Sequence, residues 1–84
     1  MAITVRFPAM LQPTAGTEVL IDEPVSDVGG LLVALERKVP GLSAHLADPI
    51  FNIAINDEML LHGVRTHPLK DGDTVEIVPT ISGG

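Results

Sequence analysis

The stretch of sequence that decides the fold lies at the end of the chain, where residues 67–84 read HPLKDGDTVEIVPTISGG. Gly72 stands between two aspartates, a composition typical of tight turns, and glycine supplies a positive φ where a turn requires one. Val75 and Ile77 alternate with polar residues, as in a strand that buries one face. Residues 79–84 are expected to form a flexible tail that ends in two glycines. The stretch therefore predicts a turn, a final strand and a projecting tail.

Two more strands are predicted at the start of the chain. Each alternates apolar and polar residues, with inward-facing positions at Ile3, Val5 and Phe7 in the first and at Val19 and Ile21 in the second. Residues 12–16, which read QPTAG, are expected to form a turn or loop between them. The two strands are therefore expected to pair as a hairpin.

The period of the apolar residues then changes to that of an amphipathic helix. The residues at helical spacing are Val28, Leu31, Leu32, Leu35, Val39 and Leu42. Ser26 is the expected N-cap, and Pro40 with Gly41 is expected to end the helix. Gly29 and Gly30 cost the helix about 1 kcal/mol each relative to alanine. Two interpretations stay open: the glycines permit close packing on a sheet, or they are only tolerated.

The remaining segment predicts two strands and completes the fold class. Phe51, Ile53 and Ile55 alternate with smaller or polar residues in a strand that we expect at the centre of the sheet. A turn at 56–58 and a short strand at 59–61 follow. The chain is thus expected to be one α+β domain, residues 1–84, with a mixed four- to five-stranded sheet packed on one main helix.

Composition excludes several classes of function. The chain has no cysteine, so it offers no thiolate nucleophile, disulfide or zinc-thiolate site. Its five lysines and arginines are scattered against eleven acidic residues, which argues against binding to nucleic acid. The three histidines lack the spacing of metal ligands, so we expect no metal and no bound cofactor. No segment approaches the length of a membrane span, and we expect a cytoplasmic protein.

No residue of the folded domain forms a convincing catalytic group, which leaves the terminal Gly83 and Gly84. A carboxylate on an arm without side chains can enter a narrow cleft of another protein. Beside it, Met59, Val78, Ile81 and Ser82 are the expected partner-binding residues. Val78 breaks the inward alternation, and an apolar cluster next to a projecting tail is typical of a docking surface.

Taken together, these elements resemble the ubiquitin-like β-grasp sulfur carriers of the MoaD/ThiS family. The resemblance covers the whole chain. It rests on Val5–Phe7 with Ala15–Thr17, Val39–Leu42, Ile55–Glu58, and above all His67–Val75 leading to Ser82–Gly84. The run from Pro68 to the terminus is its most specific part.

The resemblance implies a protein co-substrate and not an enzyme. An E1-like adenylating enzyme would activate the carboxylate of Gly84 with ATP, and a sulfur donor such as a sulfurtransferase would convert the acyl-adenylate into a thiocarboxylate. A biosynthetic enzyme would then accept the sulfur. The end product would be molybdopterin, with this chain as the small subunit of a molybdopterin synthase-like complex, or cysteine or another thio-metabolite.

The chain departs from the molybdopterin branch at two places. Residues 77–81 read IVPTI, where that branch has an aromatic pair and two prolines, and Pro8-Ala9 replaces a Phe-Ala pair. Leu11-Gln12-Pro13 is closer to the branch that serves cysteine biosynthesis. Two other classes stay open: a ubiquitin-like modifier conjugated through Gly84, and a β-grasp interaction module whose tail has no chemical role.

Overall fold

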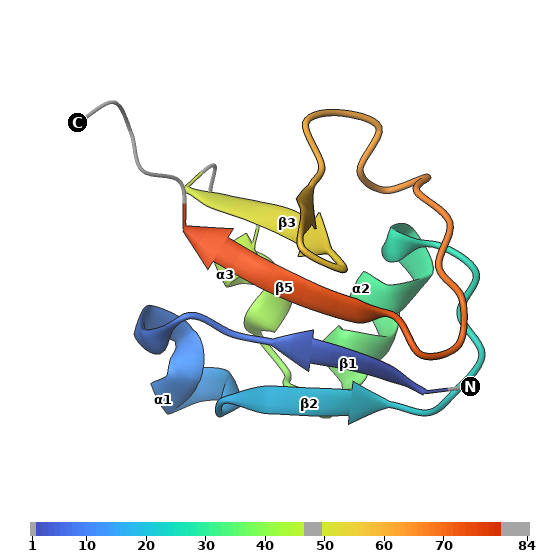
Figure 1. Ribbon diagram of the computed structural model, residues 1–84. Coiled ribbons are helices and arrows are strands. Elements are labelled where there is room, and N and C mark those ends of the chain that lie inside the picture. Colours follow the sequence, from blue (N-terminus) through green and yellow to red (C-terminus); the bar gives the residue numbers. More distant parts are fainter. Residues whose placement is uncertain (1, 47–49, 80–84) are drawn as a thin grey trace.

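A mixed five-stranded sheet forms one layer of the protein, and the main helix packs across one of its faces (Figure 1). The computed structural model describes residues 2–46 and 50–79. The strands are β1 (Ile3–Arg6), β2 (Glu18–Ile21), β3 (Phe51–Ile55), β4 (Glu58–Met59) and β5 (Thr74–Pro79). Their order across the sheet is β2-β1-β5-β3-β4. The predicted fold class is therefore confirmed.

The last strand holds the sheet together. β5 lies between β1, to which it is parallel, and β3, to which it is antiparallel. The first two strands pair as the expected antiparallel hairpin, with Ile3 opposite Ile21. The sequence prediction placed β3 at the centre, which is wrong: β5 occupies that position. Sequence alternation shows which face of a strand is buried, but it does not show which strand has neighbours of full length on both sides.

The main helix, α2 (Val28–Lys38), begins one residue later than expected. Its N-cap is Asp27 and not Ser26, because the Asp27 carboxylate accepts a hydrogen bond of 2.8 Å from the amide of Gly30. Close packing occurs at Gly29, against a loop and not against the sheet: its amide donates to the carbonyl of Arg65. A Cβ at Gly29 would approach that carbonyl oxygen to 3.2 Å. The glycine therefore lets the 63–67 loop lie against the helix.

The core between sheet and helix is mainly aliphatic, with the aromatic ring of Phe7 also buried in it. The fully buried large side chains come from both layers: Ile3, Val5, Ile21, Val28, Leu31, Leu35, Leu42, Val75 and Ile77. Leu69 is also buried and anchors the segment before β5 to the core. Burial of such side chains contributes about 1.5–3 kcal/mol each, which makes this layer the main source of stability.

Three short helical segments replace expected loops. The 3₁₀ turn η1 (Ala9–Leu11) runs into α1 (Gln12–Ala15), where Pro13 fits the first turn because it needs no amide donor there. After α2, Gly41 has a φ of +94° and turns the chain into α3 (Leu42–Leu46). These segments are too short to show a helical period in sequence.

Two boundaries also differ from the prediction. β4 covers Glu58–Met59 instead of 59–61, since the turn at Asn56 and Asp57, both with positive φ, brings the chain back one residue earlier. Pro79, assigned to the tail from sequence, is the last residue of β5 and lies opposite Phe51. The rest of the predicted tail, residues 80–84, lies outside the described residues.

Candidate functional site

The tail leaves the domain at the end of its central strand. Pro79 ends β5 opposite Phe51, the first residue of β3. Ile81, Ser82, Gly83 and Gly84 follow, and all four lie outside the described residues. The candidate site thus has two parts: the expected reactive terminus at Gly84, and the surface of the folded domain near the point where the tail begins.

The sheet face opposite α2 carries the two described residues of the expected docking surface. On β5, Val75 and Ile77 are buried against the helix, so Val78 points to the opposite, outer face, as predicted. Residues directly opposite each other on neighbouring strands point to the same face. Because Met59 lies opposite Ala54, and Ala54 opposite Glu76, Met59 belongs to the same outer face as Val78.

Met59 and Val78 share this face without being adjacent. Met59 is 40% exposed on the edge strand β4. Val78 is half-buried on β5, two strands away, and directly precedes Pro79, the last residue of that strand. Ala54 lies between them and is only 6% exposed. We call the three residues Met59, Ala54 and Val78 the outer apolar patch. Sequence reasoning missed Ala54, although its place in the β3 alternation assigns it to this face.

A row of charged residues continues this face across the sheet. Glu76 lies opposite Arg6 of β1, and Arg6 lies opposite Glu18 of β2. The outer apolar patch therefore borders on side chains of alternating charge. The sequence analysis assigned no role to these charged residues. The alternation of apolar and polar residues along each strand is the pattern that places them on this face.

The turn that leads into β5 is held by one buried carboxylate. Asp73 accepts hydrogen bonds from the Asn56 side-chain amide, at 3.0 Å, and from the Lys70 backbone amide, at 2.9 Å. Asn56 in turn accepts from the backbone amide of Thr74. Burial alone raises the pKa of Asp73, but the hydrogen bonds from Asn56 and Lys70, with the nearby positive charge of Lys70, lower that pKa overall. This network fixes where β5 starts.

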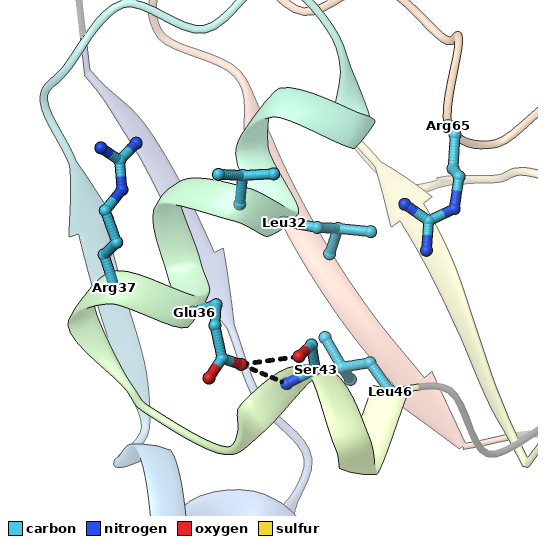
Figure 2. A pocket seen from close by; sticks show the side chains of 7 residues that line it. Leu32, Glu36, Arg37, Ser43, Leu46 and Arg65 are labelled. Atoms are coloured by element: carbon cyan, nitrogen blue, oxygen red, sulfur yellow. Dashed lines mark hydrogen bonds between the residues drawn. The ribbon is translucent and has the colours of Figure 1, made fainter.

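The described residues contain no cluster of three or more histidines, cysteines or carboxylates that could hold a metal ion. A polar hollow of about 360 Å³ lies beside the Asp73 network and is lined in part by His67 and Lys70. An apolar hollow of about 350 Å³ lies on the helix side of the molecule and is lined by residues of α2 and α3 together with Arg65 (Figure 2). At the apolar hollow the Ser43 hydroxyl donates to the Glu36 carboxylate, but the backbone amides of Gly41 and Ser43 lower the pKa of Glu36 and make it a weak base. Within residues 2–46 and 50–79, the domain presents surfaces and no assembled catalytic site.

Together, the mixed sheet packed on one main helix and the position of the tail after the central strand define a ubiquitin-like β-grasp protein. The sequence model of the ThiS family matches residues 5–84. The chain therefore belongs to the ThiS family. The sulfur carrier protein CysO of Mycobacterium tuberculosis is 31% identical over 93 residues, with all of this chain and all of CysO covered.

Solved structures agree with this assignment. The crystal structure of the Amycolatopsis orientalis BexX/CysO complex contains a chain similar to this one, with a TM-score of 0.81, 29% identity, and 99% of this chain and 100% of that chain covered. The solution structure of small archaeal modifier protein 1 from Methanosarcina acetivorans has a TM-score of 0.77 and 31% identity, with 99% and 96% covered. The family's fold thus occurs in proteins named as carriers and in one named as a modifier.

In the part of the chain that the structure describes, no helix is long and apolar enough to cross a bilayer.

Proposed function

We propose that this chain is a sulfur carrier that works as a protein co-substrate: its Gly84 carboxylate is adenylated by an E1-like enzyme and then converted into a thiocarboxylate. The observation that carries the proposal is the match of the ThiS family model to residues 5–84 together with the full-length match to a protein named as a sulfur carrier; both matches include Gly83 and Gly84. The folded domain docks on the partner and presents the Gly84 carboxylate to it, and the partner catalyses the reaction.

The chemistry requires activation because a carboxylate is a poor electrophile. The adenylating enzyme joins the Gly84 carboxylate to the α-phosphate of ATP and releases pyrophosphate. A sulfur donor, such as a sulfurtransferase carrying a persulfide, attacks the acyl-adenylate, and AMP leaves. Reductive cleavage of the resulting acyl disulfide by a thiol leaves the thiocarboxylate on Gly84. ATP is used by the partner, so this chain needs no nucleotide site of its own.

The position of the tail suits delivery to a buried site. Five residues follow Pro79, and at about 3.3–3.6 Å per residue they reach about 17 Å when extended. Gly83 and Gly84 have no side chain, so the end of the arm fits a channel too narrow for a Cβ. The domain can therefore stay outside the partner while its terminus reaches the reacting groups.

The outer apolar patch supplies the docking surface in this proposal. Met59 and Val78 are on the sheet face from whose central strand the tail continues, and both have exposed apolar area. Apolar anchors inside a polar rim are the usual source of affinity at interfaces. Ile81 and Ser82 would extend the contact along the tail. The same face would serve the activating enzyme and the sulfur-accepting biosynthetic enzyme in turn.

Cysteine or another thio-metabolite is the favoured destination of the sulfur, and molybdopterin is the alternative. The similarity to CysO of M. tuberculosis supports the first, as do residues 11–13 and the missing aromatic pair before the tail. In the second case this chain would be the small subunit of a molybdopterin synthase-like complex.

An intact-mass experiment tests the proposal. The purified chain is incubated with the E1-like enzyme encoded in the same genome, Mg-ATP and a sulfide source. We expect one oxygen of the terminal carboxylate to be exchanged for sulfur, and alkylation by iodoacetamide to mark the product. Failure to form the acyl-adenylate or the thiocarboxylate with any such enzyme would refute the carrier proposal.

A protein modifier is the second candidate, because a chain named as a small archaeal modifier protein shares the fold at 31% identity. In that case Gly84 forms an isopeptide bond with a lysine of a target protein. An epitope tag at the N-terminus separates the two functions in cells. Tagged conjugates of higher mass that disappear on deletion of Gly84 would favour the modifier.

A further inference from the structure

Strand β2 forms an open edge of the sheet. It comes first in the strand order, and among the described strands only β1 pairs with it (Figure 1). The strand at the other edge, β4, covers only Glu58–Met59 and offers few backbone groups. β2 covers Glu18–Ile21 and is the longer of the two edges. An edge strand presents backbone donors and acceptors with which another chain can pair.

One hydrogen bond shows which residues of β2 bond to β1. The amide of Phe7 donates to the carbonyl of Thr17 at 3.0 Å, just beyond the ends of the two strands. In an antiparallel ladder, hydrogen-bonded pairs alternate with non-hydrogen-bonded pairs. The next pair in the register, Arg6 and Glu18, is therefore a non-hydrogen-bonded pair. It follows that the backbone amide and carbonyl of Glu18 point away from β1, to the open edge.

A second hydrogen bond gives the same result for Leu20. The amide of Thr4 donates to the carbonyl of Asp73 at 3.2 Å, on the side of β1 that pairs with β5. Thr4 lies opposite Leu20 on β2. Because Thr4 directs its amide to the β5 side, it does not bond to Leu20, and the backbone groups of Leu20 also point to the open edge. Glu18 and Leu20 therefore each offer one donor and one acceptor there.

The side chains of the same two residues lie on the outer face of the sheet. Leu20 is 54% exposed, and Glu18 is exposed as well. Asp22, exposed and directly after the strand, continues the alternation. Within residues 2–46 and 50–79, neither of these two carboxylates has an ion pair. Arg6 lies between Glu18 and Glu76, so one cation faces two carboxylates. Every second position of the edge is thus acidic, apolar and acidic in turn.

We propose that β2 is a docking edge for an extended segment of a second, basic protein, which adds to the sheet as an antiparallel strand. The segment has an apolar residue opposite Leu20, and a lysine or arginine two residues away on each side, opposite Glu18 and Asp22. Residues two apart on a strand share a face, so the three contacts form together on the outer face. The net charge of −6 also favours a basic partner.

A second copy of this chain fits the edge less well. If two β2 strands pair with Leu20 opposite Leu20, each Glu18 lies opposite Asp22 of the other copy. Like charges directly opposite each other destabilise a strand pair. A shift that places Glu18 opposite Leu20 removes this repulsion but provides no attractive charge pair. A basic segment provides two such pairs, and it is therefore the favoured occupant.

The docking edge and the outer apolar patch can be occupied at the same time. A strand added to β2 lies three strand spacings from β5, which carries Val78, and this distance is about 14 Å. Met59 on β4 is farther away still. One protein can therefore hold the domain by β2 while another binds the patch. This inference does not rest on the proposed sulfur-carrier function.

NMR titration of the ¹⁵N-labelled full chain with two blocked peptides tests the proposal. The first, acetyl-TKTVTKT-amide, has the expected spacing, and in the second both lysines are replaced by glutamates. For the first we expect a dissociation constant of about 1 mM. The amides of Glu18 and Leu20 should shift and exchange more slowly with solvent, while those of Glu58 and Met59 stay unchanged. The second peptide should bind about tenfold more weakly.

Two outcomes of the titration would overturn the proposal. One is the lack of saturable shifts at Glu18 and Leu20 with the first peptide at up to about 5 mM. The other is the appearance of the same shifts when the chain alone is concentrated, because they would assign the edge to a second copy.

Variants separate the backbone contact from the charges. Leu20→Pro removes a donor that makes no bond to β1, and proline is tolerated at such a position of an edge strand. It should weaken the first peptide about three- to tenfold, read from the Glu18 amide, whereas Leu20→Val should bind almost as the native chain does. In the double variant Glu18→Gln with Asp22→Asn, the two peptides should differ by about twofold or less. Unchanged binding by folded Leu20→Pro, or an unchanged difference between the peptides in the double variant, would contradict the proposal.

Discussion

The two faces of strand β5 differ in what they contribute to the protein. On the inner face, Val75 and Ile77 are almost fully buried against α2. On the outer face, Glu76 and Val78 are half-buried and lie among polar and apolar side chains that face solvent. Successive residues of one strand therefore serve stability and recognition alternately. The difference teaches that a substitution two or three residues before the tail can unfold the domain or leave it intact, depending only on which face it occupies.

The largest effect is expected on the inner face. Ile77→Ala removes a side chain that is 2% exposed and leaves a cavity between sheet and helix. We expect the free energy of unfolding to fall by about 2–5 kcal/mol. Val78→Ala is the matched control on the outer face, where the loss should be about 1 kcal/mol or less. Urea denaturation measures both, and equal losses would break the distinction between the two faces.

The next effect is at the turn that precedes the strand. Asp73→Ala leaves the donors of Asn56 and of the Lys70 amide without their acceptor, and we expect a loss of about 1–3 kcal/mol at pH 7. The pKa of Asp73 is lowered in the folded state. Its charge therefore stabilises the fold above the unfolded pKa of about 3.9, and that contribution is lost as the pH falls through the folded pKa.

Denaturation at two pH values checks this linkage. The stability difference between the native chain and Asp73→Ala should be largest near neutral pH and should shrink as the pH falls through the lowered pKa of Asp73 in the folded state. Asn56→Ala serves as a second variant, because it removes one hydrogen-bond donor to Asp73 and leaves the Asp73 carboxylate in place. A difference that stays constant from neutral to acid pH would show that the charge of Asp73 contributes nothing.

Alternation and helical period in the sequence were sufficient to predict most of the fold. The inward positions of Val75 and Ile77 follow from residue order alone, and the structure confirms them. The class of fold follows from the order of the elements, with the final strand and Gly-Gly tail as its most specific sign. The central place of β5 did not follow, because strand order depends on long-range pairing with β1 and β3.

Features that depend on single hydrogen bonds were harder to predict. Ser26 and Asp27 are both good N-cap residues, and the choice falls to Asp27 because its carboxylate reaches the Gly30 amide. Of the predicted docking residues, Val78 and Met59 are on one face. The β3 alternation assigns Ala54 to that face too, but its position between them follows only from the register of β3. Ile81, Ser82, Gly83 and Gly84 lie outside the described residues, so their roles stay predictions.

A smaller effect on stability, with a larger one on binding, is expected at the outer apolar patch. Met59→Arg and Val78→Arg should each change the free energy of unfolding by about 1 kcal/mol or less, because neither side chain fills the core. Each should weaken binding to the adenylating enzyme by about tenfold or more if the patch is a docking centre. Isothermal titration calorimetry with that enzyme measures the change.

Leu20→Arg is the matched control for these two variants. Leu20 is 54% exposed and lies opposite Thr4, on the same sheet face but at the far edge. The Leu20→Arg variant should leave the affinity for the adenylating enzyme nearly unchanged. Equal weakening by all three substitutions would show that the added charge, and not the patch, determines the result.

Deletion of Gly84 tests the central claim most directly, because that claim separates the reacting terminus from the domain that presents it. The shortened chain and the full chain are incubated with the adenylating enzyme, Mg-ATP and a sulfide source, and the same samples are used for intact mass and thermal unfolding. We predict that the thiocarboxylate forms only on the full chain and that the two melting temperatures agree. A thiocarboxylate on the shortened chain at the same rate, or a large fall in its melting temperature, would contradict the account.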